Sequence, residues 1–280
     1  MTYRSLLVSL GPDPLCAERT RVAIALANEF ECHVVGVAPT GLVDLQVSPG
    51  AAATLADVAA LAWDALRSRA DRAAQRFRDD CVAAGVESFE ALVEESEPAS
   101  SLVHHAHCSD LSVLTQADPA AAGHRMAHEV VVRVVLQSAR PTLILPHASR
   151  CDRVGSNVLV AWDDSREAAR ALADALPLLR RAARVQVVAW NEARAHDGKP
   201  LRARLDALQR WLTRHGVAAE LRVQTTRVAI AEAIRAHAAE LNADLLVMGA
   251  YGHSRWAERV LGGATRGLLA SMTVPVLMSH

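Results

Sequence analysis

Residues 156–190 read SNVLVAWDDSREAARALADALPLLRRAARVQVVAW. The stretch starts with a short apolar run, turns at two aspartates, continues with helical spacing of apolar residues and ends in a second apolar run. Two apolar runs joined by one helix are typical of a β-α-β unit with parallel strands. The stretch therefore predicts a parallel sheet covered by helices on both faces.

The same unit occurs a second time in the chain. Residues 4–39 read RSLLVSLGPDPLCAERTRVAIALANEFECHVVGVAP, and RVVLQSARPTLILP at 133–146 corresponds to RGLLASMTVPVLMS at 266–279. A repeat of well over a hundred residues indicates two related domains rather than a solenoid. We place them at 1–148 and 153–280, separated by the polar segment HASRCDRVGS, in which Gly155 is the expected breaker.

The C-terminal half gives a readable order of elements. Asp164 is the expected cap of a helix that starts near Arg166, with Glu167 completing a capping box. Gly216 is the expected end of another helix. Strands are predicted at 157–162, 185–190, 219–225, 245–248 and 274–278, and further helices at 201–212, 230–241 and 263–271.

The N-terminal half follows this order with an insertion. Gly11 corresponds to Asp163 and Gly85 to Gly216, which leaves about 21 additional residues around 40–62. Leu55, Val58, Leu61 and Ala62 have helical spacing within it. We expect an extended helix or a lid there.

Composition and charge narrow the class of protein. Of the 280 residues, 51% are hydrophobic and 22% charged, which is typical of a packed, water-soluble core. No apolar stretch is long enough to span a membrane. Residues 1–150 hold 12 arginines against 18 acidic residues, whereas residues 151–280 hold 18 basic against 13 acidic residues. The basic half either attracts an anionic ligand or only has solvated helix faces.

The cysteines and the N-terminal residues indicate in which cellular compartment the protein is expected. The five cysteines are odd in number and form no CxxC motif. MTYRSLLVSL enters a predicted strand at once, without the apolar region of a signal peptide. We expect a reducing compartment, the cytoplasm.

The stretch GAYGHSRWAERVLGGAT at 249–265 follows a predicted strand and contains four glycines. It lacks the lysine of a phosphate-binding P-loop, and no GxGxxG dinucleotide motif is present. Glycines let a backbone approach a ligand closely, and the helix from Gly263 directs free N–H groups to the same space. Spacing alone leaves two interpretations, a phosphate cradle or a tight strand-to-helix connection.

Gly249-x2-Gly252-x9-Gly262 resembles the G-x2-G-x9-G-(S/T) motif of the universal stress protein family. NVLVAWDDS, ADLLVMGAYGHS and TVPVLM are also similar to segments of that family. The resemblance covers the whole chain as a tandem pair, strongly over 153–280 and weakly over 1–148. It implies two tandem doubly wound α/β domains, each with a five-stranded parallel sheet flanked by helices, of the adenine nucleotide alpha hydrolase-like type. It also implies a stress-response protein that binds ATP or another adenine nucleotide, as some branches do.

The resemblance assigns roles to particular residues. Asp163 would face the adenosine, and the backbone at Trp190 would lie near the base. The residues around the phosphates would be Gly249, Gly252, Gly262, Gly263, Ala264 and Thr265. Gly263 departs from the usual Ser or Thr, so one side-chain donor is lost there. Arg255 could contact a γ-phosphate, and the only metal expected is Mg²⁺ that accompanies ATP.

The N-terminal half departs further from the motif. Thr115 and Asp118 stand at the positions of Gly249 and Gly252, and Glu129 at that of Gly262. Side chains would block the backbone approach, and a carboxylate would repel phosphate. We predict that residues 1–148 bind no nucleotide in this mode.

Other interpretations remain open at this point. The chain could be a slow ATP hydrolase, although no catalytic residue is indicated, or a structural protein with two non-binding pockets. His104, His107 and Cys108 share a helical face, as do His124 and His128, but both sets fit an ordinary helix better than a zinc site. By resemblance, 142–145 and 274–278 would pair the halves as an internal pseudo-dimer, and a homodimer is possible. We expect no nucleic-acid or membrane partner, and the sequence does not identify a protein partner.

Overall fold

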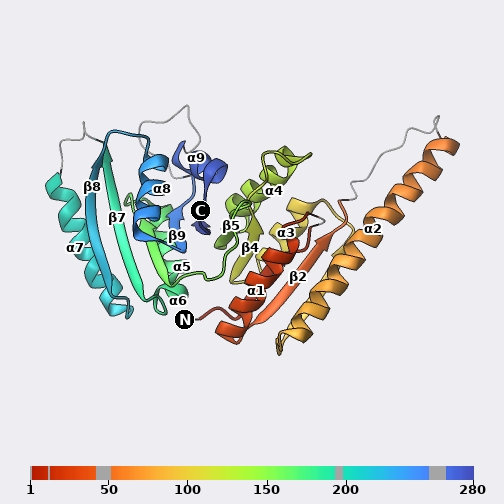
Figure 1. Cartoon of the computed structure of the whole chain (residues 1–280), viewed down its shortest axis with the longest axis horizontal. Helices are drawn as coiled ribbons and strands as arrows, with labels where there is room; N and C mark the ends of the chain where they lie inside the picture. Colours follow the sequence, from red (N-terminus) through yellow and green to blue (C-terminus); the bar gives the residue numbers. More distant parts are fainter. Residues whose placement is uncertain (1, 12, 42–51, 193–197, 252–262) are drawn as a thin grey trace.

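The computed structural model describes residues 2–11, 13–41, 52–192, 198–251 and 263–280. The N-terminal half alternates strands with helices (Figure 1). Its elements are β1 (Ser5–Ser9), α1 (Cys16–Phe30), β2 (His33–Pro39), α2 (Ala52–Ala83), β3 (Phe89–Glu94), α3 (Pro98–Ala106), β4 (Leu111–Thr115), α4 (His124–Gln137) and β5 (Thr142–Leu145).

The C-terminal half repeats this alternation. Its elements are β6 (Asn157–Ala161), α5 (Arg166–Asp174), α6 (Leu176–Leu179), β7 (Arg184–Glu192), α7 (Gly198–Arg214), β8 (Ala219–Thr226), α8 (Ile230–Leu241), β9 (Leu245–Gly249), α9 (Gly263–Ser271) and β10 (Val276–Ser279). The short helix α6 was not predicted. Its Pro177 lies at the start of a helix, a position that a proline tolerates well.

The strands form one sheet in the order β3-β2-β1-β4-β5-β10-β9-β6-β7-β8. Within each half the paired strands are parallel, and the two halves have the same strand order. The predicted doubly wound α/β class is confirmed. The two five-stranded sheets are, however, continuous, because β5 and β10 pair antiparallel.

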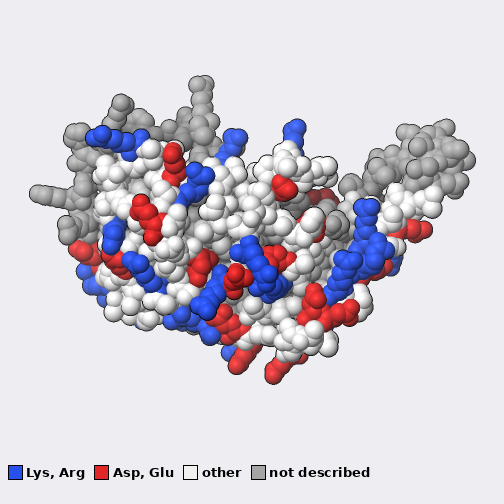
Figure 2. Space-filling model, viewed as in Figure 1, with Lys and Arg blue, Asp and Glu red and all other residues white. Residues whose placement is uncertain are grey.

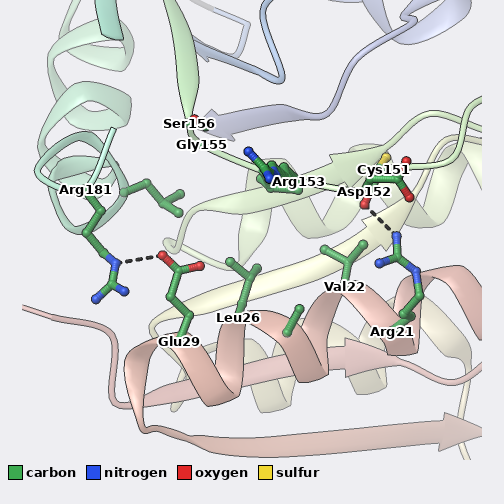
Figure 3. A pocket seen from close by; sticks show the side chains of 13 residues that line it. Arg21, Val22, Leu26, Glu29, Cys151, Asp152, Arg153, Gly155, Ser156 and Arg181 are labelled. Carbon is green, nitrogen blue, oxygen red and sulfur yellow. Dashed lines mark hydrogen bonds and ion pairs between the residues drawn. The ribbon is translucent and has the colours of Figure 1, made fainter. Parts of the chain in front are cut away.

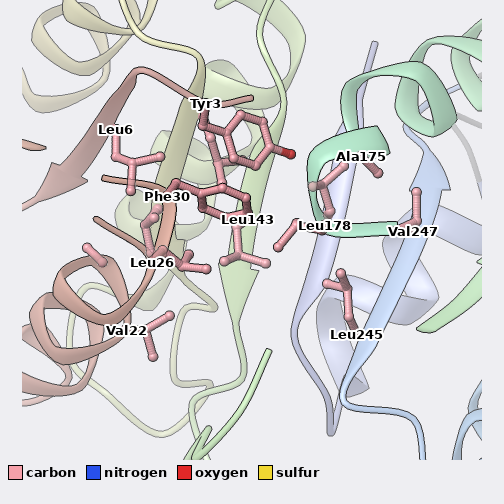
Figure 4. Packing of buried hydrophobic residues seen from close by; sticks show 14 of the residues in the cluster. Tyr3, Leu6, Val22, Leu26, Phe30, Leu143, Ala175, Leu178, Leu245 and Val247 are labelled. Atoms are coloured by element: carbon pink, nitrogen blue, oxygen red, sulfur yellow. The ribbon is translucent and has the colours of Figure 1, made fainter. Parts of the chain in front are cut away.

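Helices cover both faces of this sheet. One apolar cluster packs α1, α2, α5, α6 and α7 on one face, and a second packs α3, α4, α8 and α9 on the other. The first cluster crosses from one half to the other without a break. Figure 4 shows Tyr3, Leu26 and Phe30 facing Ala175 and Leu178 across the boundary.

Polar contacts also join the halves. The Tyr3 hydroxyl donates to the Asp174 carbonyl at 2.7 Å, and the Gln116 side chain donates to the Leu269 carbonyl at 2.8 Å. Both Tyr3 and Gln116 are buried. Burial of a polar group is tolerated when such a hydrogen bond satisfies it, so these contacts also fix the position of one half on the other.

In each half, an aspartate accepts hydrogen bonds from the backbone at the start of the first strand. Asp110 accepts from the backbone N–H groups of Arg4 and Ser5 at 2.7 and 3.1 Å. Asp244 accepts from the N–H groups of residues 155–157 at 2.8–3.1 Å. Both aspartates directly precede the strand that pairs with the capped one. The repeat therefore extends from topology to individual hydrogen bonds.

The part of the N-terminal insertion that the structure describes from residue 52 on is helical. Of the two expected alternatives, an extended helix or a lid, residues 55–62 form a helix as part of α2, which projects well beyond the sheet (Figure 1). Residues 42–51 lie outside the described part. Leu61 and Trp63 on α2 are 71% and 45% exposed, whereas Phe77 further along is fully buried against Phe89.

Replacement of Phe77 tests how α2 is anchored. We expect Phe77→Ala to lower the free energy of unfolding by about 3–5 kcal/mol, because it removes a buried ring and leaves a cavity. Chemical denaturation measures this. Val82→Ala on the same helix, where the side chain is 69% exposed, should change stability by no more than about 0.5 kcal/mol. Equal effects of the two substitutions would contradict this anchoring.

Candidate functional site at the strand switch

The candidate site lies where the C-terminal sheet reverses its strand order. β6 pairs with β7 on one side and β9 on the other, and all three are parallel. The helix that follows β6 packs on one face of the sheet, and the helix that follows β9 packs on the other. Ligands of open α/β sheets bind in the crevice that such a reversal leaves at the carboxyl ends of the strands.

Asp163 lies at this edge, just beyond β6, and is exposed. Its Oδ1 accepts from the backbone N–H of Ser165 at 3.0 Å and from the Ser165 hydroxyl at 2.6 Å. In the described part of the chain, Oδ2 has no hydrogen-bond partner. One carboxylate oxygen is thus held in place, and the other is free to accept a hydrogen bond.

The prediction that Asp164 and Glu167 form a capping box is wrong. The helix does begin at Arg166, but the cap is Ser165, whose hydroxyl accepts from the Ala168 N–H at 3.1 Å. Asp164 has a left-handed backbone with φ of 62°, and its carboxylate bonds Arg204 of α7 at 2.6 Å. It therefore connects the β6–α5 turn to α7 rather than satisfying the helix end.

Glu167 is a buried carboxylate that the sequence analysis took for part of the cap. Its side chain lies in the first turn of α5 and bonds Arg166. Burial acts to raise the pKa of Glu167, but the hydrogen bond from Arg166 and that from the backbone outweigh it, so the pKa is lowered. A charged group is thus held directly beneath the edge of the sheet.

Gly249 is required by packing. A Cβ at this position would lie 2.5 Å from the Ala168 nitrogen and 2.6 Å from the Glu167 carbonyl carbon. Those atoms are backbone of the first turn of α5 and cannot yield easily. The first glycine of the motif is therefore required by the close approach of β9 to α5, a packing reason that neither interpretation of the spacing included.

Thr265, in the first turn of α9, bonds back to the end of β9. Its buried hydroxyl accepts from the Tyr251 N–H at 3.2 Å, and Tyr251 has a left-handed backbone with φ of 54°. This bond joins the exit of β9 to the first turn of α9. Gly263 begins that helix, and Ala264 is partly exposed. Gly252, Arg255 and Gly262 lie outside the described residues.

Trp190 lies on β7 and packs edge-on against His237 of α8, with ring centroids 5.9 Å apart. The buried His237 bonds the Gln186 side-chain oxygen through Nε2, and its Nδ1 accepts from the Gln224 amide at 3.1 Å. These partners fix a neutral imidazole with the proton on Nε2. Burial lowers the pKa of His237, and Glu240 opposes this. This network was not predicted from the sequence.

The equivalent edge of the N-terminal half is filled by Arg19. Its guanidinium is buried, and it donates to the Ser9 carbonyl at 2.5 Å and to the Thr115 hydroxyl at 2.8 Å. Two further bonds hold Asp13, at 3.2 and 2.9 Å. Ser9 and Thr115 are the last residues of β1 and β4, so one side chain bridges the carboxyl ends of both strands at the switch.

The other sequence candidates form no grouped site in the part of the chain that the structure describes. His104, His107 and Cys108 are exposed, and His107 bonds the Gln137 carbonyl at 3.3 Å. Across the described ranges, no three His, Cys, Asp or Glu side chains are grouped to hold a metal ion. Asp118 accepts from the Ala120 N–H at 2.8 Å, and Glu129 is exposed on α4. All five cysteines are free thiols.

A separate cleft of about 240 Å³ lies between α1, α6 and the linker (Figure 3). Arg181 pairs with Glu29 across it at 2.7 Å, and Arg21 donates to the Cys151 carbonyl at 2.5 Å. Burial raises the pKa of the Cys151 thiol to about 11, so the thiol is unreactive at neutral pH. The pairs in this cleft already hold the halves together.

The fold is that of a doubly wound α/β protein, and the edge at β6 is its candidate site. Residues 156–280 match the model of the universal stress protein family. Residues 156–280 are thus a domain of this family, and the N-terminal half repeats the strand order of that domain. A comparison with curated protein sequences gave no match.

Solved structures of whole-chain length share the fold. A universal stress protein of Archaeoglobus fulgidus DSM 4304 has a TM-score of 0.71 and 17% identity over 98% of this chain and 97% of that chain. A candidate universal stress protein of Pseudomonas aeruginosa UCBPP-PA14 has a TM-score of 0.61 and 16% identity, over 99% and 93%. At these identities the similarity concerns the fold. No helix in the described ranges is both long and apolar enough to cross a membrane.

Replacement of Gly249 separates packing from ligand binding. We expect Gly249→Ala to destabilise the ligand-free protein by about 1–3 kcal/mol, because the new methyl group overpacks against α5. Chemical denaturation without nucleotide measures the change. A variant as stable as wild type would show that the glycine is not needed for packing.

The His237 network predicts a pH dependence of stability. Because the pKa of His237 is lower in the folded chain than its usual 6.5, the unfolded chain takes up the proton first as pH falls. The contribution of His237 to the free energy of unfolding is thus fully present above about pH 6.5 and is lost as the pH falls below this value. The charged groups that influence the pKa are Glu240, Arg222, Glu220 and Arg184.

Urea denaturation at pH 7.5 and 5.5 measures this effect in wild type and His237→Gln. We expect wild type to lose more stability on acidification than the variant, which lacks the group. The variant serves as the control for the other histidines, of which the chain has 12 in all. The same loss in both proteins would contradict the assignment.

Proposed function

We propose that the domain at 156–280 binds an adenine nucleotide at the strand switch and that the chain is a nucleotide-responsive binding or regulatory protein in stress response. The observation that carries this proposal is the position of Asp163. It stands at the carboxyl end of β6, with one carboxylate oxygen anchored by Ser165 and the other open. Such an acceptor suits a ribose hydroxyl or the amino group of adenine.

The phosphates would lie at the other end of the crevice. Thr265 and the first turn of α9 are adjacent to the end of β9, and free N–H groups at a helix start favour anions. Gly263 contributes no side-chain donor, but its backbone N–H remains. Each hydrogen bond to a charged group is worth about 1.5–3 kcal/mol, so a few of them are sufficient for micromolar binding.

Binding to only one of the two halves follows from the contrast between their edges. In the N-terminal half, Arg19 bridges the ends of β1 and β4, and Thr115 stands where the C-terminal half has Gly249. A ligand there would have to displace a buried guanidinium, which has five hydrogen-bond donors, from its partners at the strand ends. We therefore propose a single nucleotide per chain, bound by the C-terminal half.

Calorimetric titration with ATP, ADP and AMP tests the role of Asp163. We expect Asp163→Ala to weaken binding of the preferred nucleotide by about 10-fold to 100-fold, because one hydrogen bond to a charged group is lost. Asp152→Ala is the matched control. It removes the same charge from an exposed position on the linker and should leave the affinity unchanged.

Two results would contradict the proposal. One is a purified protein that releases no adenine nucleotide on denaturation and whose melting temperature is unchanged by millimolar ATP. That outcome would favour a structural or interaction protein. The other is equal affinity of wild type and Asp163→Ala. A turnover assay on the same samples separates simple binding from slow hydrolysis, since only hydrolysis gives multiple turnovers that the substitution lowers.

A further inference from the structure

A second cavity, of about 290 Å³, lies in the N-terminal half between α1 and α2. The wall from α2 is basic, and the wall from the β1–α1 connection and α1 is small and polar. The lining residues from α1 and its connection are Gly11, Asp13, Cys16, Ala17 and Thr20, and those from α2 are Arg69, Arg72, Ala73, Arg76, Phe77 and Asp80. This cavity is separate from the nucleotide site proposed above, and the inference below does not rest on that site.

Three arginines give the cavity its chemical character. Arg69, Arg72 and Arg76 follow helical spacing along one side of α2, and all three are exposed. In the described part of the chain none of them has an ion pair or hydrogen bond. Their neighbours on α2 differ, since Arg67 pairs with Glu95 at 2.5 Å and Arg78 donates to the Ala91 carbonyl at 2.9 Å. The unpaired arginines are those that line the cavity.

The acidic residues of the cavity do not cancel this charge. Asp13 is neutralised by Arg19, which holds it through two hydrogen bonds and lowers its pKa against the effect of burial. Asp80 is then the one carboxylate of the lining that is left to oppose three guanidinium groups. The balance is about two positive charges on one side of the cavity. Figure 2 shows basic side chains gathered over α2, at the right of the view.

The remaining lining is apolar or weakly polar. Phe77 forms the fully buried floor, and Ala17 and Ala73 add methyl groups. The buried Thr20 adds a hydroxyl, and Cys16 adds a thiol whose pKa is raised by burial, so that it carries no charge at neutral pH. A ligand would meet guanidinium groups and, beside them, a small apolar surface.

We propose that this cavity binds a small phosphate monoester whose alcohol part is short and apolar. A phosphate dianion matches the two uncompensated positive charges, and guanidinium groups bind phosphate oxygens in pairs. The apolar part packs against the methyl groups of Ala17 and Ala73. The N-terminal half, which lacks the glycines of the motif, thus binds an anion of its own between two helices rather than at the strand switch.

Calorimetric titration of the full chain with phenyl phosphate and with inorganic phosphate tests the proposal. We expect phenyl phosphate to bind, and Arg72→Gln/Arg76→Gln to weaken its binding at least tenfold. Arg67→Gln is the matched control, because it removes a charge from the same helix outside the cavity. Inorganic phosphate should bind more weakly than phenyl phosphate, since it gains nothing from the apolar wall.

Alkylation of cysteine provides a local readout. At alkaline pH, where part of the Cys16 thiol is ionised, we expect phenyl phosphate to slow the reaction of Cys16 with iodoacetamide at least threefold, while the exposed Cys108 reacts unchanged as internal control. Asp163→Ala should retain phenyl phosphate binding, which keeps this test independent of the nucleotide site. Absence of binding, equal affinity of the double variant and wild type, or an unprotected Cys16 would each overturn the proposal.

Discussion

The antiparallel pairing of β5 with β10 is the interaction on which the rest of the molecule depends. Each of these short strands would otherwise be the open edge of a five-stranded sheet, with a row of unpaired backbone groups. Leu143 and Leu277 face each other in this pair and are fully buried. Pairing satisfies the backbone groups and also lets the apolar cluster around α1, α2 and α5 to α7 continue across the boundary.

Within that shared scaffold the two halves use the strand switch differently. In the C-terminal half, a glycine lets α5 approach β9, and Asp163 stands exposed beyond β6. In the N-terminal half a threonine replaces the glycine, and the guanidinium of Arg19 spans the strand ends. One edge therefore has room for a ligand, and the other is filled by the protein itself. The same topology supports both because strand pairing, not the edge residues, determines the fold.

The periodicity of apolar residues was sufficient to predict most of the helices and strands of the fold. The helices at 230–241 and 263–271 have the predicted bounds, since each has a regular apolar stripe between clear breaks. The cap was misassigned because the left-handed backbone of Asp164 depends on its contact with Arg204, forty residues away. Likewise, the packing role of Gly249 comes from a neighbouring helix that no local pattern reveals.

The burial of two polar side chains could in principle have been predicted from the sequence. Arg19 lies in line with the apolar residues Val22, Leu26 and Phe30 of α1, and His237 in line with Ile234 and Leu241 of α8. A polar residue within an apolar stripe indicates a buried partner, but which partner depends on strands distant in the sequence. Their hydrogen bonds to Ser9 and Thr115, and to Gln186 and Gln224, could be assigned only in three dimensions.

The covalent linker gives the seam between the halves a further property. In a pair of separate chains, contact between β5 and β10 would depend on protein concentration. Here the linker makes it an intramolecular contact with a fixed effective concentration. Dilution does not separate the halves, and neither half has to be able to pair with a copy of itself. Divergence of one half is thus tolerated as long as it still presents a strand to the other.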